Sequence, residues 1–401
     1  MEPAMKRLLL VLTLAAGVPF VACQPKPDTS ADAKKKDGKK KDTKKDDDED
    51  GEYDAAERPK PPPPLPIDDE RMLRQLQADN EGLKRELAEG KSDRITGVIN
   101  AHEHLYKLKD LEKYLPAARR AGVVTTVVVS SPIFTLEGKG EKGEPGMSKN
   151  FEDVVLEASK QYPGEIIPFC TIDPRDPGKL DRLKKHVQMG CKGLKMYSGH
   201  TNFYDGPLDA TDMDPVFSYV EEIGLPVLWH VYMSKYWDEI THVINKHPKM
   251  NLLIPHYGVV FWKPKDGTLQ KLEQLMREHK NLYIDTSLGT RQILTDGMAA
   301  IEPAIPDFQQ FFSEFQDQIV WGTDSVITGN NEKTPAWFEK VIWATRDHLE
   351  KDVLTTDLAA AYSKYYQKGR DGDGRYQGLH LPAPILKKIY VDNAKRWLHL
   401  K

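Results

Sequence analysis

Short apolar runs rich in β-branched residues recur from Arg94 onward, and segments with the periodicity of amphipathic helices lie between them. Strand alternating with helix indicates parallel β-α-β units. The predicted strands cover residues 96–99, 123–129, 166–171, 193–196, 226–229, 252–254, 282–284 and 319–321. The predicted helices cover residues 111–121, 151–161, 180–189, 217–223, 237–245, 269–279 and 308–316.

Eight strands with intervening helices predict the α/β class and, within it, a (β/α)₈ TIM barrel over residues 93–401. An open, doubly wound parallel sheet is the alternative. The barrel is favoured because polar residues stand at the C-terminal ends of nearly all the runs, where a TIM barrel places its active site.

The first 22 residues have the pattern of an export signal. Lys6 and Arg7 precede an apolar run, Leu8 to Val21, which is too short to span a bilayer comfortably. The run ends just before Cys23 and resembles a bacterial lipobox, which implies cleavage before Cys23 and lipid attachment to it. An ordinary secretory signal is the alternative. The lipoprotein interpretation places the protein in the cell envelope, on the periplasmic side or the cell surface, and Gln24 favours the outer membrane over the inner.

Residues 23–67 have the composition of a disordered tether. Residues 34–45 hold eight lysines among twelve residues, residues 46–54 hold seven carboxylates among nine, and four prolines follow at 61–64. Almost nothing here can be buried, so disorder is expected. We interpret the segment as a solvated spacer rather than a binding site for phosphate or anionic lipid.

Residues 68–92 predict a short helix. Its apolar positions and one asparagine alternate at spacings of three and four, as in a heptad repeat, at Leu73, Leu76, Asn80, Leu83 and Leu87. A short coiled coil that forms a homodimer is one interpretation. An amphipathic helix docked on its own domain is the other, and it is favoured because the repeat covers barely two heptads.

Composition excludes several classes. The chain has 401 residues and a formal net charge of -4, which gives no support to nucleic-acid binding. Three cysteines exclude a disulfide scaffold, and a mean hydropathy of -0.58 excludes a polytopic membrane protein. Cys170 and Cys191 lie near the third and fourth predicted strands, and we expect no disulfide between them because strand geometry disfavours it.

The candidate metal-binding residues lie at the C-terminal ends of the predicted strands. His102 and His104 end the first strand, and side chains two residues apart on a strand point to the same side, so both imidazoles can reach one metal ion. His230, His256 and Asp324 follow the fifth, sixth and eighth strands. These ends meet at one mouth of a barrel. Three imidazoles and a carboxylate with an open position are typical of a catalytic zinc site.

With these residues in place, the sequence resembles the amidohydrolase superfamily. Within it, the chain is most similar to the amidohydrolase-2 group, which includes aminocarboxymuconate-semialdehyde decarboxylase. The resemblance spans roughly residues 95–398. It is carried by His102-Glu103-His104, Gly193-Leu194-Lys195 and residues 225–230, 255–258, 283–287, 322–324 and 393–396. Asn100 occupies the position where the family usually has an aspartate. Because an asparagine carries no charge, it cannot act as a negatively charged residue that supports the metal ligands.

The resemblance implies His102, His104, His230 and Asp324 as metal ligands for Zn²⁺ or another divalent ion such as Mn²⁺. It places His256 beside the metal, as a substrate polariser or as a ligand of a second ion. A carboxylate that touches both metal and water is positioned to take the proton and pass it to the leaving group. Asp324 and His256 are therefore the expected catalytic residues.

The role of Lys195 distinguishes a site for two metal ions from a site for one. Binuclear members of the superfamily carry a carboxylated lysine in the fourth strand, so Lys195 would complete a ligand set for two ions. The amidohydrolase-2 group more often uses one ion, and a lysine here can instead anchor a substrate carboxylate. We expect one ion rather than two.

Three functions fit these residues, and all of them involve a small-molecule partner. The first is a metal-dependent hydrolase that cleaves a C–N or C–O bond in an amide, lactone or ester. The second is a non-hydrolytic decarboxylase or hydratase acting on a carboxylated substrate. The third is a catalytically silent surface binding protein, which the complete ligand set argues against.

Overall fold

The computed structural model describes residues 94–136, 150–200, 203–261, 266–289, 291–358 and 374–401. The signal peptide (1–22), the lipidated Cys23, the tether (23–67) and the helix of residues 68–92 lie outside these ranges and stay predictions. No helix within the described ranges is both long and apolar enough to cross a membrane.

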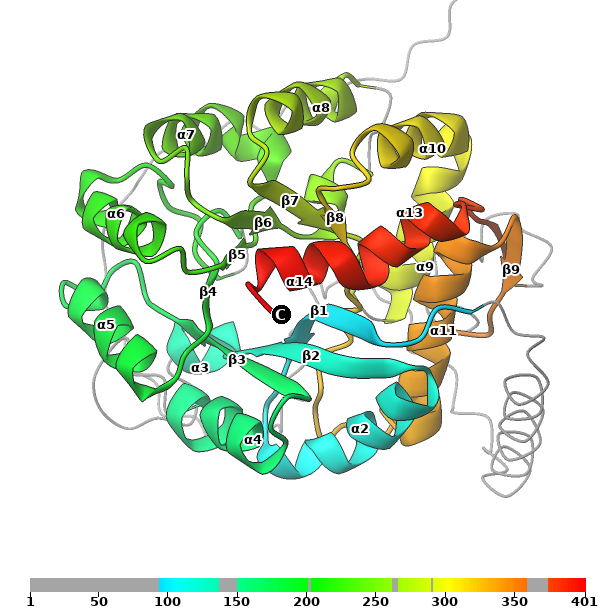
Figure 1. The fold of residues 1–401 in the computed structure, drawn as a ribbon, viewed down its shortest axis with the longest axis horizontal. Coiled ribbons are helices and arrows are strands. Elements are labelled where there is room, and N and C mark those ends of the chain that lie inside the picture. Colours follow the sequence, from blue (N-terminus) through cyan, green and yellow to red (C-terminus); the bar gives the residue numbers. More distant parts are fainter. Residues whose placement is uncertain (1–93, 137–149, 201–202, 262–265, 290, 359–373) are drawn as a thin grey trace, which may run out of the picture. The chain divides into compact units, whose positions relative to one another are not determined.

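Eight parallel strands form the predicted barrel, each hydrogen-bonded to the next along the chain (Figure 1). They are β1 (Val98–His104), β2 (Val123–Val129), β3 (Ile166–Thr171), β4 (Gly193–Met196), β5 (Val227–Trp229), β6 (Leu252–Ile254), β7 (Leu282–Asp285) and β8 (Ile319–Val320). All except β1 lie within one residue of their predicted bounds. β1 continues through the polar residues up to His104, because the strand stays buried along its whole length.

Backbone hydrogen bonds between β1 and the segment that follows β8 close the ring. The Ala101 amide donates to the carbonyl of Trp321 at 2.9 Å, and the Asp324 amide donates to the carbonyl of His102 at 2.9 Å. One bridge further along, Leu105 pairs with Ile327. The first and last parts of the barrel are therefore joined next to the candidate ligands His102, His104 and Asp324.

Helices surround the strands, and those predicted from the sequence are present. They are α2 (Leu111–Arg120), η3 (Asn150–Val155) with α4 (Leu156–Gln161), α5 (Lys179–Met189), α6 (Asp214–Glu222), α7 (Met233–Lys246), α8 (Thr268–Glu278) and α10 (Ile305–Glu314). Each has an apolar face, such as Leu269, Leu272 and Leu275 of α8, which are all buried. This face packs against the outside of the barrel.

The structure adds elements that the sequence pattern did not indicate. The longer helices among them are α9 (Arg291–Ile301) and α11 (Pro335–Glu350), and the shorter ones are α3 (Pro132–Thr135), α13 (Ala383–Lys387) and α14 (Asn393–Trp397). Single turns are η2 (Leu108–Asp110), η4 (Thr211–Met213), η5 (His256–Val259), η6 (Glu302–Ala304) and η7 (Lys388–Asp392), and β9 (Val353–Thr355) pairs antiparallel with β10 (Arg375–Gln377).

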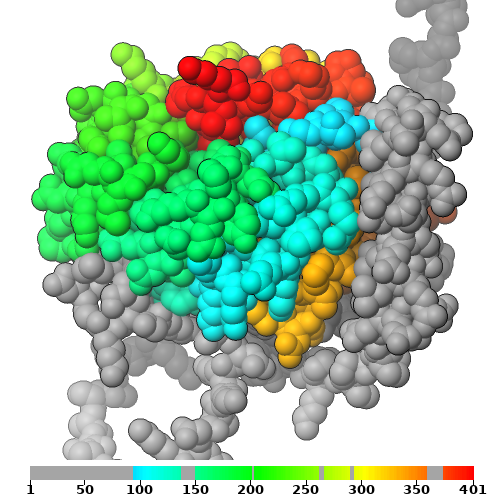
Figure 2. Space-filling view, turned by 60° about the horizontal axis from the view of Figure 1, so that its bottom comes forward, coloured from blue at the N-terminus to red at the C-terminus, as the bar shows by residue number. Residues whose placement is uncertain are grey.

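Apolar side chains fill the barrel below the candidate site. Ile99, Val127, Leu228 and similar residues from the strands form this inner core together with Trp397 of α14. The rings of Phe169 and Trp397 have their centroids 5.5 Å apart. In Figure 1, α14 lies across one end of the ring, and Figure 2 shows the C-terminal segment, in red, beside the start of the barrel, in blue and cyan. That end is closed by α14.

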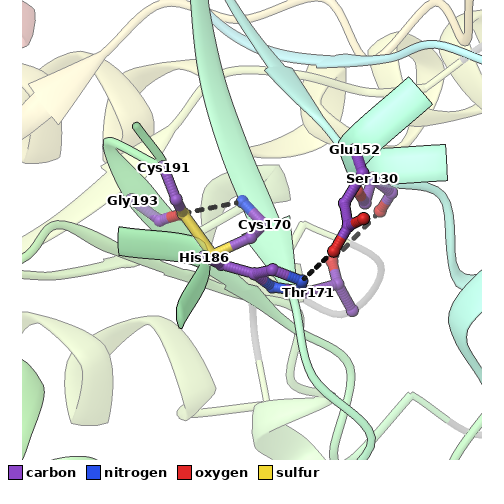
Figure 3. Close-up of a disulfide and its surroundings, with 7 residues drawn as sticks. All are labelled: Ser130, Glu152, Cys170, Thr171, His186, Cys191 and Gly193. Atoms are coloured by element: carbon purple, nitrogen blue, oxygen red, sulfur yellow. Dashed lines mark hydrogen bonds and ion pairs between the residues drawn. A yellow bond between two sulfur atoms is a disulfide. The ribbon is translucent and has the colours of Figure 1, made fainter. Parts of the chain in front are cut away.

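A disulfide joins Cys170 to Cys191, so the expectation of no bridge was wrong (Figure 3). Cys170 lies in β3, but Cys191 lies two residues ahead of β4, in the turn that follows α5. Gly190 adopts φ of +119° in this turn, and the Lys192 amide donates to the carbonyl of Pro168. The turn thereby brings the two Cα atoms to 5.8 Å, within the range that a disulfide requires. Strand geometry alone, on which the expectation rested, takes no account of this turn.

Candidate active site

His102 and His104 lie side by side at the C-terminal end of β1. Their ring centroids are 5.5 Å apart, and both side chains are buried. The register of β1 against β2 shifts between Asn100 and Glu103. Irregularities of this kind often occur next to active sites, where they re-aim side chains.

Asp324 reaches both of these histidines from the segment after β8. Its Oδ1 atom is 3.3 Å from Nε2 of His104 and 3.6 Å from Nε2 of His102. Its Oδ2 atom is 3.6 Å from Nε2 of His256. The carboxylate of Asp324 therefore lies among three imidazoles that come from two different strands.

His230 and His256 complete the cluster from the ends of β5 and β6. Nε2 of His256 is 3.2 Å from Nδ1 of His230, and the ring centroids are 4.8 Å apart. The structure thus brings together all four histidines and the aspartate that the sequence singles out, at the C-terminal ends of the strands.

The ligand atoms form two overlapping groups. His102, His104 and Asp324 offer atoms that all lie within 4.8 Å of one another, and so do His102, His256 and Asp285. His230 belongs to neither group, but it lies against His256. Its Nε2 atom is buried and makes no hydrogen bond within the described part of the chain.

Hydrogen bonds determine which imidazole nitrogens carry lone pairs. A carboxylate can only accept, so Nδ1 of His102 donates to Oδ2 of Asp285 at 2.9 Å, and the lone pair of His102 is on Nε2. Ser287 Oγ donates to Oδ1 of Asp285 and accepts from Nδ1 of His256 at 2.8 Å. His256 Nε2 then accepts from Nδ1 of His230, which leaves the lone pair of His230 on its unpartnered Nε2.

Burial keeps His102 and His230 neutral. It lowers the pKa of His102 to about 4, with the charge of Lys195 adding to the effect. Burial, with smaller contributions from His200 and His256, also lowers the pKa of His230 well below its usual value. Burial opposes ionisation of Asp324, but the neighbouring imidazoles outweigh it and hold its pKa far below the usual range. Neutral imidazoles and an ionised carboxylate are the forms that bind metal ions.

Lys195 lies within this cluster, as its position in the fourth strand predicted. Its side chain is completely buried in β4, and Nζ donates to Nε2 of His102 at 2.8 Å. The ammonium nitrogen is also 5.1 Å from the ring centroid of Tyr197. The lysine and Asp324 thus face the same imidazole nitrogen.

Asp285 and Ser287 hold the imidazoles but were given no role from the sequence. Besides His102, Asp285 accepts from the backbone amides of His256 and Ser287, both at 2.9 Å. Burial raises the pKa of this carboxyl, but His102 more than offsets it, so the pKa is lowered. Asp285 ends the seventh strand, so the strand-end rule that found the histidines would also have found it.

Aromatic residues surround His230 on the β4 side. The ring centroid of His200 is 4.2 Å from that of His230, and His200 also contacts Phe203 and Tyr232. Burial lowers the pKa of His200 to about 3, with Lys195 contributing. His200 lies in an irregular segment after β4. No pattern of apolar and polar positions there distinguishes it from other loop residues.

Known proteins share this architecture. Residues 99–400 match the family model described as Amidohydrolase. A probable 2-pyrone-4,6-dicarboxylic acid hydrolase from Acinetobacter baumannii, solved with citric acid, aligns over 76% of this chain and 100% of its own, with 13% identity and a TM-score of 0.50. A 4-oxalomesaconate hydratase from Rhodopseudomonas palustris aligns over 75% and 95%, with 14% identity and a TM-score of 0.46.

A 2,6-dihydroxybenzoate decarboxylase from Rhizobium aligns over 76% of this chain and 99% of its own, with 16% identity and a TM-score of 0.45. A search of curated proteins gives no match. At 13% identity, the structure from Acinetobacter baumannii shows a shared fold alone, whereas the family model covers most of the chain. The chain therefore belongs to the amidohydrolase family.

Proposed function

We propose that this amidohydrolase is a metal-dependent hydrolase that cleaves a C–N or C–O bond, as in an amide, lactone or ester. The position of Asp324 carries the proposal. Its Oδ1 atom is buried, lies 3.3 Å from Nε2 of His104 and makes no hydrogen bond within the described residues. A buried carboxylate oxygen in this state is costly unless a cation or a proton joins it.

Three donor atoms, from His102, His104 and Asp324, lie within 4.8 Å of one another and fit a divalent metal ion, and His230 lies beside this group, against His256. The lone pairs of His102 and His230 are both on Nε2, and the carboxylate of Asp324 is ionised. We assign His102, His104, His230 and Asp324 as ligands. Imidazole and carboxylate suit Zn²⁺ and also Mn²⁺, and a ligand set of this kind with an open position is typical of catalytic zinc.

One ion fits better than two. With Lys195 unmodified, the second group of donor atoms is His102, His256 and Asp285. Both oxygens of Asp285 are already used, since Oδ2 accepts from His102 and Oδ1 accepts from the His256 amide and from Ser287. Asp285 is therefore better suited to orient the imidazoles than to bind an ion.

When bound, the ion would lower the pKa of a coordinated water and polarise the scissile carbonyl. Asp324 would accept the proton of that water and return it to the leaving group. His256 would contact the substrate or its leaving group through Nε2, since Ser287 holds Nδ1 of its ring and Asp285 holds its backbone amide. The substrate would be a small molecule that reaches the C-terminal ends of the strands.

One observation favours a second function. The ammonium group of Lys195 is buried within the site, 2.8 Å from His102. A cation at this depth suits a substrate carboxylate, which a decarboxylase or hydratase acting on a carboxylated substrate would present. The same lysine could also become carboxylated and bridge two ions.

We also propose that the enzyme acts in the cell envelope, anchored to a membrane through lipid on Cys23. The disulfide between Cys170 and Cys191 supports this proposal, because structural disulfides persist in oxidising compartments and are rare in the cytosol. No nucleic-acid partner is proposed.

Metal analysis combined with a substrate screen tests the function. We expect purified protein to hold about one equivalent of Zn²⁺ or Mn²⁺ per chain. It should hydrolyse a member of a panel of lactones, esters and amides. A chelator should abolish turnover, and re-adding the metal should restore it. Carboxylated dienes belong in the panel, because release of CO₂ or addition of water to them, without hydrolysis, would favour the second function. Protein that binds no divalent metal would contradict both.

A further inference from the structure

Asp324 has a backbone conformation that needs external support. Its φ angle is +50°, and Val326, two residues later, has φ of +52°. Residues other than glycine rarely adopt this left-handed conformation, and a β-branched valine is a clear outlier there. Such strain persists only where surrounding contacts over-determine it, and it concentrates at functional sites.

Asn100 provides one set of these contacts. Its side chain is completely buried in β1. Oδ1 accepts from the backbone amide of Thr323 at 3.1 Å, and Nδ2 donates to Oγ1 of the same threonine at 2.8 Å. Oδ1 also accepts from the amide of His102 at 3.2 Å. One amide group therefore binds the residue before Asp324 and a candidate metal ligand at once.

Glu103 provides the second set. It is completely buried, and its Oε1 atom accepts from the backbone amide of Ser325 at 3.1 Å and from Oγ of Ser325 at 2.6 Å. Oε1 also accepts from the hydroxyl of Thr323. Glu103 therefore holds the residues on both sides of Asp324.

These contacts join two groups of candidate ligands. The Asp324 amide donates to the carbonyl of His102 at 2.9 Å, so the strand that carries His102 and His104 also fixes the backbone of Asp324. On the far side, Nζ of Lys333 donates to the carbonyls of Ser325 and Val326, at 3.1 and 2.9 Å. The segment around Asp324 is thus held from both sides.

The neutral amide of Asn100 also supplies a hydrogen-bond donor to Glu103. Nδ2 of Asn100 donates to Oε1 of Glu103 at 3.3 Å and to the hydroxyl of Tyr114 at 2.9 Å. An aspartate at position 100 would lose these donors and bring a second carboxylate within hydrogen-bond distance of Glu103. A neutral Asn100 is therefore the partner that a buried Glu103 requires.

We propose that Asn100 and Glu103 are positioning residues that hold Asp324 in its left-handed conformation and so aim its carboxylate at the shared ligand site. The inference rests on the proposed metal role of Asp324. Neither side chain contacts a donor atom of the ligand site. Asn100 acts through Thr323 and the backbone amide of His102, and Glu103 acts through Thr323 and Ser325. By fixing where Asp324 points, they set the metal affinity of the site.

Cobalt(II) binding to the full-length protein, stripped of metal with a chelator, tests this inference without an identified substrate. Glu103→Ala removes the acceptor, and we expect Co²⁺ affinity to fall about 10- to 100-fold, the usual effect of losing a residue that orients a ligand. The visible absorption spectrum of the Co²⁺ form should change as well. Glu103→Gln keeps a carbonyl oxygen as acceptor and should recover most of the affinity.

Asn393→Ala is the matched control. Asn393 is equally buried, and its amide holds the other end of β8 by donating to the carbonyls of Gln316 and Ile319. Its loss should lower the melting temperature but leave Co²⁺ affinity and spectrum unchanged. Ser325→Ala, which removes a single donor, replaces Glu103→Ala if the latter does not fold, and it should weaken binding several-fold.

The outcomes separate the two proposals. Wild-type protein that binds no Co²⁺ would overturn the proposed function together with this inference. Wild-type protein that binds Co²⁺ while Glu103→Ala binds it no more weakly than Asn393→Ala would overturn the inference alone. A Glu103→Gln variant as weak as Glu103→Ala would do the same, because the acceptor would then not be what positions Asp324.

Discussion

The carboxylate of Asp324 lies between Nε2 of His104, at 3.3 Å, and Nε2 of His256, at 3.6 Å. As a metal ligand and a proton acceptor, it would serve two purposes that one substitution can separate. An asparagine still offers one oxygen to a metal ion, but it cannot accept a proton at neutral pH.

We therefore expect Asp324→Asn to keep its metal while turnover of an identified substrate falls about 10²- to 10⁴-fold, the usual size of general acid–base catalysis. His102→Ala should instead empty the site and abolish activity through metal loss. Metal content and turnover, measured on the same preparations, distinguish the two effects. His348→Ala is the control, since His348 is also buried but lies in α11. Asp324→Asn with metal and near-full turnover would make His256 the leading candidate for the base.

Some residues of the site could be predicted and others could not, for physical reasons. His102, His104, His230, His256 and Asp324 share one signal, a metal-binding side chain at a strand end. Asp285 has the same signal. Glu103 could not be predicted, because alternation in β1 points it away from the ligands, and its partners Thr323 and Ser325 are more than two hundred residues away in sequence.

Elements with a regular apolar pattern were the easiest to predict. The strands are buried on both faces and read as continuous apolar runs, and the helices around them keep a regular apolar stripe. α11 was not predicted because polar residues are buried along it, among them Glu339, Thr345 and Arg346. Arg346, for example, donates to the carbonyls of Ala121 and Ile95, so its burial reflects contacts that only the tertiary fold creates.

The disulfide also acts at the level of secondary-structure elements, since it joins β3 to the turn before β4. Its two cysteines are 21 residues apart, and closing a loop of this length stabilises the folded state by about 3 kcal/mol in the chain-entropy account. A Cys170→Ala, Cys191→Ala double variant should lose stability of that order in chemical denaturation. Unfolding in the presence of a reductant should bring the wild type to the level of the variant and leave the variant unchanged. Equal stability of the two proteins without reductant would contradict the prediction.

At the scale of the whole molecule, the barrel carries the candidate active site, and the N-terminal segment carries the predicted lipid anchor. The TIM barrel follows from eight strand–helix units and is confirmed. The anchor follows from the lipobox pattern around Cys23, and it remains a prediction.

Cys23→Ser tests the anchor, because a serine cannot be lipidated at this site. We expect the wild-type protein in membrane fractions and the variant in the soluble fraction of the cell envelope, with the metal site intact in both. Cys170→Ala, Cys191→Ala is a control for loss of a thiol elsewhere, and it should stay with the membranes. If wild type and Cys23→Ser partition alike, the lipid anchor is absent.

Trp397 and the inner core have a kinetic consequence. Apolar side chains fill the barrel beneath the candidate site, and Trp397 packs on Phe169 at the closed end. Within the described residues, the barrel is thus closed at the end covered by α14. For the proposed enzyme, substrate and product would share the opening at the C-terminal ends of the strands. We therefore expect the product to compete with the substrate, which initial rates measured with added product would show.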